Sequence, residues 1–341
     1  MATANVRDVA ALANVSVGTV SNVLNHSKPV SPDTERRVLD AIDKLGFVRN
    51  DAARQLRMGR SRTVGFMVLD VANPFFTDVA RGAEDTLAPL GRPLLLGNSG
   101  DARGRELAYL DLFEEQRVAG LLITPVGQVH SRLIRLRERG SPVVLVDRHD
   151  NGRSFSSVSV DDRRGGELAA AHLLDLGRTR VAFLGGPASI LQVEQRARGA
   201  ADAVRTRAGR ATLRVLEQET MNAEGGRAGA ERLLALPAAE RPDAIFAAND
   251  LMALGVLQAL TFAGVRVPDD IALIGYDDIF YAATAAVPLS SVRQPAREMG
   301  RAAADLLLHE IDAPTPPTEY RHVTFSPELV VRDSTAGRPT P

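Results

Sequence analysis

The chain has 341 residues, of which 45% are apolar and 24% charged, and its formal net charge is −1. This length allows two or three domains with substantial cores, and the absence of cysteine excludes disulfides and thiol catalysis. No run of 18 apolar residues and no signal-peptide pattern occurs in it, so the sequence predicts a cytoplasmic globular protein without a membrane segment.

Two short helices are predicted first, within residues 6–25, which read VRDVAALANVSVGTVSNVLN. Apolar residues recur at helical spacing in both: Val9, Ala10 and Ala13, and then Val20, Val23 and Leu24. Asn14 tolerates the left-handed conformation of a sharp turn, and Ser16 is placed to cap the second helix. This pattern is typical of a helix-turn-helix.

The face of the second helix opposite its apolar stripe carries small polar groups: Gly18, Ser21, Asn22 and Asn25. Such amides and hydroxyls can form hydrogen bonds with DNA base edges and phosphates. The alternative is an ordinary amphipathic helix pair with a solvated polar face, which would have the same sequence pattern. Residues 1–60 hold nine basic and six acidic side chains, an excess of +3, which leaves −4 for the other 281 residues. A basic N-terminal segment followed by an acidic remainder favours a nucleic-acid-binding module attached to another domain.

A third helix is predicted to begin at Ser31-Pro32-Asp33, where a capping serine precedes a proline and an acid, and to end at Gly46. Its apolar stripe is Val38, Ile42 and Leu45. Residues 50–56, NDAARQL, form a further short helical pattern that is too short to be stable alone.

These first 60 residues resemble the DNA-binding headpiece and hinge of the LacI/GalR family of bacterial transcription regulators. The resemblance implies that the helix from Val17 enters the major groove, with Val17, Gly18 and Asn22 nearest the bases. It also implies phosphate contacts for three further residues, Thr19, Ser21 and Asn25. Leu56 of the hinge would insert into the minor groove beside its dimer mate; the alternative is that residues 50–60 are only a flexible linker.

Beyond Arg62, short apolar runs alternate with amphipathic helical patterns such as 75–90, 163–176 and 251–262. The predicted strands are 64–69, 93–96, 120–123, 143–146, 181–184, 244–247 and 271–275. They are short and apolar, as strands buried on both faces are. The fold class is therefore α/β with parallel sheets, preceded by an all-α headpiece.

The residues alone leave open one large sheet or two smaller ones. The same family resemblance, carried by NPFF (73–76), LVDR (145–148), AND (248–250) and GYDD (275–278), implies a two-lobed, periplasmic-binding-protein-like core. The chain would cross between the lobes near Asp161, Ser290 and Tyr320. The predicted division is a headpiece at 1–49, a hinge at 50–60, a core at 61–332 and a disordered tail at 333–341. Within the core, an N-lobe would hold about 61–160 and 291–319, and a C-lobe about 161–290 and 320–332.

Ligands of such sheets meet the carboxyl ends of the strands, and here Asp and Asn residues follow most predicted strands. The predicted ligand-binding residues are Phe75, Phe76, Asp147, Asp161, Arg196, Met221, Asn249 and Asp277. Carboxylates, an amide and a guanidinium bind neighbouring hydroxyls, and an aromatic ring can stack on an apolar ring face, which favours a sugar. Asp and Asn after strands are also ordinary turn and capping residues.

The sequence lacks the common catalytic motifs G-x-S-x-G, G-x-x-x-x-G-K-[ST] and H-E-x-x-H. We therefore expect a homodimeric repressor, not an enzyme, with no cofactor and no metal. It would bind a pseudopalindromic operator in double-stranded DNA under the control of a small effector, a sugar in the preferred interpretation. The alternatives are a sensor for a nucleobase or other non-sugar metabolite, and a transport-type solute-binding protein.

Overall fold

The computed structural model describes residues 4–25, 28–47, 61–127, 129–150, 154–187, 189–207, 209, 211–313 and 319–336. The chain divides into two compact units, which we call the headpiece (Met1–Arg60) and the core (Ser61–Pro341). In the part of the chain that is described, no helix has the length and apolar character needed to cross a membrane.

Three helices form the headpiece: α1 (Val6–Ala13), α2 (Val17–Asn25) and α3 (Pro32–Leu45). Asn14 ends α1 with a φ of 50°, and the Ser16 hydroxyl accepts a hydrogen bond from the Thr19 amide over 3.0 Å. Asn visits this left-handed conformation more readily than most residues, and the serine satisfies one of the free N–H groups of the first turn. The helix-turn-helix predicted from Asn14 and Ser16 is confirmed.

One small apolar core joins the three helices, built from Val9, Ala10, Ala13, Val20, Val23, Val38 and Ala41. Ser31 caps α3 by accepting a hydrogen bond from the Thr34 amide, and Gly46 ends that helix with a φ of 57°. Ile42 and Leu45, which the sequence places in the buried stripe of α3, are only half-buried and pack at the margin of this core.

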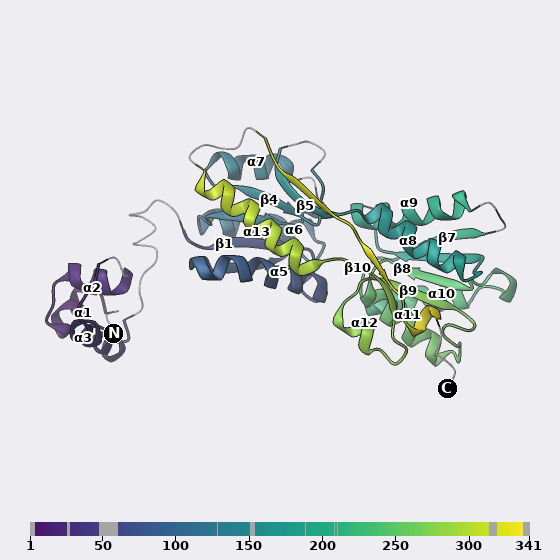
Figure 1. The fold of residues 1–341 in the computed structure, drawn as a ribbon, viewed down its shortest axis with the longest axis horizontal. Coiled ribbons are helices and arrows are strands. Elements are labelled where there is room, and N and C mark those ends of the chain that lie inside the picture. Colours follow the sequence, from purple (N-terminus) through teal and green to yellow (C-terminus); the bar gives the residue numbers. More distant parts are fainter. Residues whose placement is uncertain are drawn as a thin grey trace. The chain divides into compact units, whose positions relative to one another are not determined.

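The core contains two six-stranded sheets, as the two-lobed interpretation predicts (Figure 1). Sheet A has the order β11-β5-β4-β3-β1-β2 and is parallel throughout. Its strands are β1 (Val64–Val68), β2 (Leu94–Asn98), β3 (Gly120–Ile123), β4 (Val143–Val146), β5 (Ser156–Val160) and β11 (His322–Phe325). We call the part of the core built on sheet A the N-lobe.

Sheet B has the order β12-β10-β9-β8-β6-β7, and only β12 runs antiparallel to its neighbour. Its strands are β6 (Arg180–Gly185), β7 (Thr212–Glu217), β8 (Ala244–Ala247), β9 (Ala272–Asp277), β10 (Ser290–Arg293) and β12 (Glu328–Val330). We call the part built on sheet B the C-lobe. The fold class predicted from the sequence is confirmed.

Helices cover the sheets of both lobes (Figure 1). The N-lobe holds α5 (Pro74–Leu87), α6 (Arg103–Glu115), α7 (His130–Glu138) and α13 (Ala296–Asp312). The C-lobe holds α8 (Asp162–Asp175), α9 (Leu191–Thr206), α10 (Ala223–Leu234), α11 (Asp250–Phe262), α12 (Phe280–Thr284) and α14 (Asp333–Ala336). In β1, Phe66 packs in the apolar cluster of α5 and α13, whereas Met67 packs in the cluster of α6 and α7. Burial on both faces explains why this strand is a continuous apolar run.

The described chain crosses between the lobes at three places. The first crossing lies at Asp161, between β5 and α8, as predicted. The second follows β10 at Gln294 and the third lies between β11 and β12, a few residues after the predicted Ser290 and Tyr320. Residues 291–293 therefore belong to the C-lobe sheet and residues 322–325 to the N-lobe sheet, which corrects both predicted lobe boundaries.

These boundaries were misplaced because five strands were not predicted: β5, β7, β10, β11 and β12. β5 reads SSVSV and β10 begins with two serines, yet Ser156, Ser157, Ser290 and Ser291 are all buried. Their hydroxyls make hydrogen bonds that only the folded chain supplies, such as Ser291 Oγ to Asp250 Oδ1 over 2.8 Å. The three others, β7, β11 and β12, are edge strands, each paired with a neighbouring strand on one side only. An edge strand does not need a continuous apolar run.

The predicted disordered tail, 333–341, is wrong for its first four residues. Asp333–Ala336 forms α14, in which Ser334 and Thr335 are buried. Ser334 Oγ donates to the Leu273 carbonyl over 2.6 Å and accepts from the Ser290 amide over 2.8 Å. These small polar residues resemble a loop in the sequence because their partners are distant in it; residues 337–341 lie outside the described residues.

Candidate functional site

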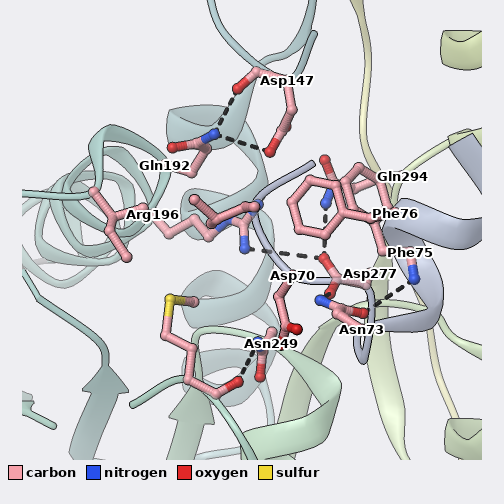
Figure 2. A pocket seen from close by; sticks show the side chains of 13 residues that line it. Asp70, Asn73, Phe75, Phe76, Asp147, Gln192, Arg196, Asn249, Asp277 and Gln294 are labelled. Atoms are coloured by element: carbon pink, nitrogen blue, oxygen red, sulfur yellow. Dashed lines mark hydrogen bonds and ion pairs between the residues drawn. The ribbon is translucent and has the colours of Figure 1, made fainter. Parts of the chain in front are cut away.

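The carboxyl ends of both sheets meet at one cleft of the core, which holds a cavity of about 50 Å³ (Figure 2). Its walls are Leu69, Asp70, Asn73, Phe75, Phe76 and Asp147 from the N-lobe, Ile190, Gln192, Arg196, Met221, Asn249 and Asp277 from the C-lobe, and Gln294 from the second crossing. The structure thus brings together seven of the eight predicted ligand residues. This is the edge at which parallel sheets bind ligands.

Arg196, on α9, is the central cation of the cleft and is only 4% exposed. Its Nε donates to Asp162 Oδ1 and its Nη1 donates to the Ala248 carbonyl, each over 2.7 Å. Nη1 also lies 4.0 Å from Asp277 Oδ1, and the guanidinium carbon lies 3.7 Å from the centre of the Tyr276 ring. Burial alone would lower the pKa of Arg196, but the adjacent Asp162 and other acidic neighbours raise it, so the side chain stays charged.

Two glycines set the position of Arg196, because they let α8 and α9 approach closely. A Cβ on Gly166 would lie 2.1 Å from the Arg196 carbonyl oxygen, and a Cβ on Gly199 would lie 1.9 Å from that of Arg163. Real Cβ atoms do not approach backbone so closely. Only glycine at both positions therefore allows the helix spacing that places the guanidinium beside Asp162.

Asp277 ends β9 and connects the two lobes. Its backbone φ is 105°, and its Oδ2 accepts a hydrogen bond from Asn73 Nδ2 over 3.0 Å. Its Oδ1 accepts from Gln294 Nε2 over 2.7 Å (Figure 2). Burial raises the pKa of Asp277 to about 6, against the lowering effect of Arg196. Because Asn73 also caps α5 through the Phe75 amide, one amide side chain joins an N-lobe helix to a C-lobe carboxylate.

Asp147, after β4, makes the second contact across the cleft. Gln192 Nε2 donates both to its Oδ2, over 2.9 Å, and to its backbone carbonyl, over 2.5 Å. Burial, with the nearby Asp162 charge, raises the pKa of Asp147 to about 8. Asp147 has a φ of 54°, and strained residues of this kind cluster at functional sites. Its Oδ1 is buried and has no hydrogen-bond partner among the described residues.

The remaining walls are aromatic and aliphatic. Phe75 and Phe76 are buried with their ring centres 5.0 Å apart in an edge-to-face arrangement. Met221 packs against Gly186, where a Cβ would lie 2.3 Å from Met221 Cγ, so this glycine leaves room for the thioether at the cleft. Asn249 caps α11 by accepting from the Met252 amide, and its Nδ2 donates to the Met221 carbonyl over 2.9 Å.

Asp161 is the one predicted ligand residue that the structure does not bring to the cleft. It is exposed and caps α8 by accepting a hydrogen bond from the Arg164 amide over 2.9 Å. Its neighbour Asp162 instead reaches inward to Arg196. The two carboxylates are adjacent in sequence, and one step along a helix rotates a side chain by about 100°.

The predicted ligand-binding residues leave out several residues of the cleft, above all Gln294 and Asn73. Gln294 follows β10, which was not predicted, so no strand end indicated it. Asn73 lies in the predicted NPFF motif, but its contact with Asp277 joins residues 204 positions apart. Among the described residues, no three His, Asp or Glu side chains gather as a metal site.

Of the predicted DNA-reading residues, all but Leu56 belong to α2, in the separate headpiece. Val17 is 43% exposed and Gly18 is exposed, whereas Thr19, Ser21 and Asn22 are half-buried. The side chain of Asn25 and all of Leu56 lie outside the described residues. An exposed Val17 is unusual in a helix whose other valines, Val20 and Val23, are buried.

Residues 5–50 match the family "Bacterial regulatory proteins, lacI family", and residues 170–335 match the "Periplasmic binding protein-like domain". HTH-type transcriptional repressor PurR of Aliivibrio fischeri is 33% identical over 338 residues, 98% of this chain and 99% of the relative. The ribose operon repressor of Bacillus subtilis is 37% identical over 305 residues, 89% of this chain and 91% of the relative.

Solved structures agree with these sequence relatives. The lac repressor dimer bound to operator and the anti-inducer ONPF has a TM-score of 0.79 at 26% identity, over 98% of this chain and 99% of that one. A LacI family transcriptional regulator from Enterococcus faecium with bound ribose has a TM-score of 0.72 at 29% identity, over 81% of this chain and 100% of that one.

Proposed function

The chain belongs to the lacI family of bacterial regulatory proteins, and from that premise we propose how its parts divide the work. Its relatives are transcriptional repressors, not enzymes, and this protein is a DNA-binding repressor controlled by a small effector. What remains to be assigned is the residues that read DNA and the class of effector. We place this activity in the cytoplasm, with the bacterial chromosome.

The headpiece reads DNA through α2. Its outer face presents Val17 and Gly18 to solvent, and Asn22 lies one turn further along the same helix. In our proposal these three residues approach base edges in the major groove, where an amide can pair with adenine and a methyl group can contact thymine. Thr19, Ser21 and Asn25 contact phosphates, which fixes the register without specifying sequence. Leu56 inserts into the minor groove.

The protein acts as a homodimer on a pseudopalindromic operator. The lac repressor, which matches this chain over 98% of its length, was solved as a dimer on its operator. A twofold protein presents two identical reading helices, so its site contains two related half-sites.

The effector is a sugar that binds in the cleft of the core. One observation supports this above all: a buried guanidinium, two buried carboxyls and four buried amides converge on one cleft beside two phenylalanine rings. This set of groups suits hydroxyls and an apolar ring face. The ribose bound to the Enterococcus relative is consistent with it.

The effector acts by changing how the two lobes meet. It contacts both walls of the cleft, and coupling between two sites in a protein is commonly about 1–3 kcal/mol, or roughly 5–150-fold in affinity. A shift of the lobes would reach DNA through the segment that joins core and headpiece.

Selection of random DNA duplexes by the full-length protein, followed by fluorescence anisotropy, tests this function. We expect a selected site with twofold symmetry, bound at least a hundredfold more tightly than random duplex at physiological salt. A sugar that binds the core should change that affinity. Equal affinity for selected and random duplexes at every salt concentration would refute the proposal.

A further inference from the structure

Two helices of the N-lobe, α5 and α13, begin beside the cleft at residues that bond to the same carboxyl group of the C-lobe. Asn73 caps α5, and its Nδ2 donates to Asp277 Oδ2 over 3.0 Å. Gln294 lies two residues before α13, and its Nε2 donates to Asp277 Oδ1 over 2.7 Å (Figure 2). A change in how Asp277 meets the N-lobe therefore acts on the starts of both helices.

The two helices pack closely against each other (Figure 1). A Cβ on Gly82 of α5 would lie 2.1 Å from a backbone oxygen of α13, and a Cβ on Gly300 of α13 would lie 2.0 Å from one of α5. The ends far from the cleft are joined as well, because Arg92 pairs with Asp312, the last residue of α13, over 3.1 Å. Contacts this close transmit a displacement of one helix to the other.

The far end of α5 is bonded to the segment by which the chain enters the core. α5 continues into a short 3-10 helix, η1 (Ala88–Leu90), which Gly91 ends with a φ of 61°. Arg62, the second residue of the core, donates from Nη2 to the Leu90 carbonyl over 2.9 Å. A guanidinium is favourable there, because the last carbonyls of a helix carry partial negative charge. Gly91 leaves the space for it, since a Cβ on Gly91 would lie 2.3 Å from Arg62 Nη2.

The residues that follow Arg62 bond to sheet A and not to the helices. The Thr63 carbonyl accepts from the Ala119 amide over 2.8 Å, and the Val64 amide donates to the Pro93 carbonyl over 2.9 Å. Arg62 thus adds a link of a different kind, which joins the entering chain to the helix pair that starts at the cleft.

We propose that Arg62 is a positioning residue for DNA binding, through which a change at the cleft reaches the headpiece along α5 and α13. This inference rests on the proposed function and deepens it, because it names the contact by which a movement of the lobes leaves the core. At about 1.5 Å per residue, the helical path from Asn73 to Leu90 spans roughly 25 Å. Substitutions at sites so far apart add in their effects unless the structure couples them.

A double-mutant cycle on the full-length protein tests the proposal, with fluorescence anisotropy on the selected operator and no effector present. Asn73→Asp keeps the cap of α5, because an aspartate also accepts from the Phe75 amide, but it loses the amide donor and meets the Asp277 carboxyl. Arg62→Met removes the guanidinium. We expect Asn73→Asp to change the operator Kd at least fivefold in the unaltered chain and less than twofold in the Arg62→Met chain.

Arg117→Met is the matched control for charge. Arg117 is exposed and lies on the same edge of sheet A, two residues before Ala119, so its loss removes the same charge from the same edge. Its cycle with Asn73→Asp should be additive. Arg62→Lys should restore the fivefold effect of Asn73→Asp, because an ammonium group can donate to the same carbonyl.

A second pair of variants tests the contact from the other side. Gly91→Ala places a methyl where the guanidinium lies and should act in the cycle as Arg62→Met does. Gly177→Ala is its control, because Gly177 also has a positive φ, 82°, but a Cβ there would meet no atom within 4 Å. It imposes a similar backbone strain and should leave the fivefold effect of Asn73→Asp intact.

Additive effects of Asn73→Asp and Arg62→Met would overturn the proposal, and so would an Asn73→Asp chain with unaltered operator affinity. A cycle with Arg117→Met that is equally non-additive would also overturn it, because charge alone would then explain the result. Failure to recognise any operator would instead refute the proposed function. If melting curves show that Arg62→Met does not fold, the cycle with Gly91→Ala decides. If Asn73→Asp does not fold, Gln294→Leu replaces it, because this variant removes the other amide bond to Asp277.

Discussion

Asp147→Asn should change how the stability of the core depends on pH. Burial raises the pKa of Asp147 to about 8 from an ordinary 3.8. Between these values the folded protein keeps one proton that the unfolded chain has released. Stability therefore falls as pH rises, because folding must take that proton from solution. An asparagine has no such proton, and its side chain can still accept from Gln192.

The size of the effect follows from one proton per molecule. Each pH unit changes the free energy of unfolding by about 1.36 kcal/mol, so the wild type should lose about 2.7 kcal/mol relative to Asp147→Asn between pH 5 and pH 7. At roughly 2–4 °C per kcal/mol for a large domain, the difference in Tm between variant and wild type should grow by about 5–10 °C over that range.

Differential scanning calorimetry of both proteins at pH 5, 6 and 7 measures this difference. Asp202→Asn is the control. The hydrogen bond from Arg163 lowers the pKa of the Asp202 carboxyl, so this carboxyl stabilises the fold at neutral pH and loses that effect only at acid pH. Its replacement should therefore leave the pH dependence of Tm between pH 5 and 7 unchanged. Tm curves of wild type and Asp147→Asn that run parallel from pH 5 to 7 would show that Asp147 is not protonated in the folded state.

Four further substitutions test separate parts of the structure. Arg196→Ala should leave buried carboxyls without a counter-charge, lower the stability of the core by about 3–5 kcal/mol in chemical denaturation, and abolish the effector response at a temperature where the fold survives. Gly199→Ala places a methyl against the Arg163 carbonyl and should lower Tm by several degrees; an unchanged Tm would contradict the close helix contact. Asn22→Ala should weaken binding to the selected operator by about 1–3 kcal/mol but spare random duplex, as anisotropy on both DNAs would show. Leu56→Ala should weaken operator binding far more than effector binding, and equal losses in anisotropy and calorimetry would argue against the hinge proposal.

The headpiece could be predicted closely because its signals are local. Asn14, Ser16, Ser31 and Gly46 act on backbone groups within a few residues, and the apolar stripes of three short helices lie within 40 positions of one another. Helix periodicity and capping need no distant partner, so the sequence carries them in full.

The α/β class and the cleft edge were also predictable, because buried parallel strands must be apolar and ligands meet their carboxyl ends. The strands with buried serines, β5 and β10, could not be predicted, because their sequences are polar. The burial of a serine such as Ser291 depends on its hydrogen bond to Asp250, which is 41 positions away in the sequence. Because β10 was not predicted, Gln294 could not be recognised as a residue at the carboxyl end of a strand.

The sequence by itself therefore determined the helix-turn-helix, the repeated strands and the kinds of groups at their ends. Only the tertiary structure decided that Asp162, and not the adjacent Asp161, faces Arg196. It also decided that the amides of Asn73 and Gln294 donate hydrogen bonds to Asp277. These choices depend on helix rotation and on contacts such as Asn73 with Asp277 across 204 residues. The reason is geometric. The sequence states which chemical groups a side chain carries, but its neighbours are determined only in the folded chain, where Gly166 and Gly199 let α8 and α9 pack closely and the strand ends of the two sheets meet.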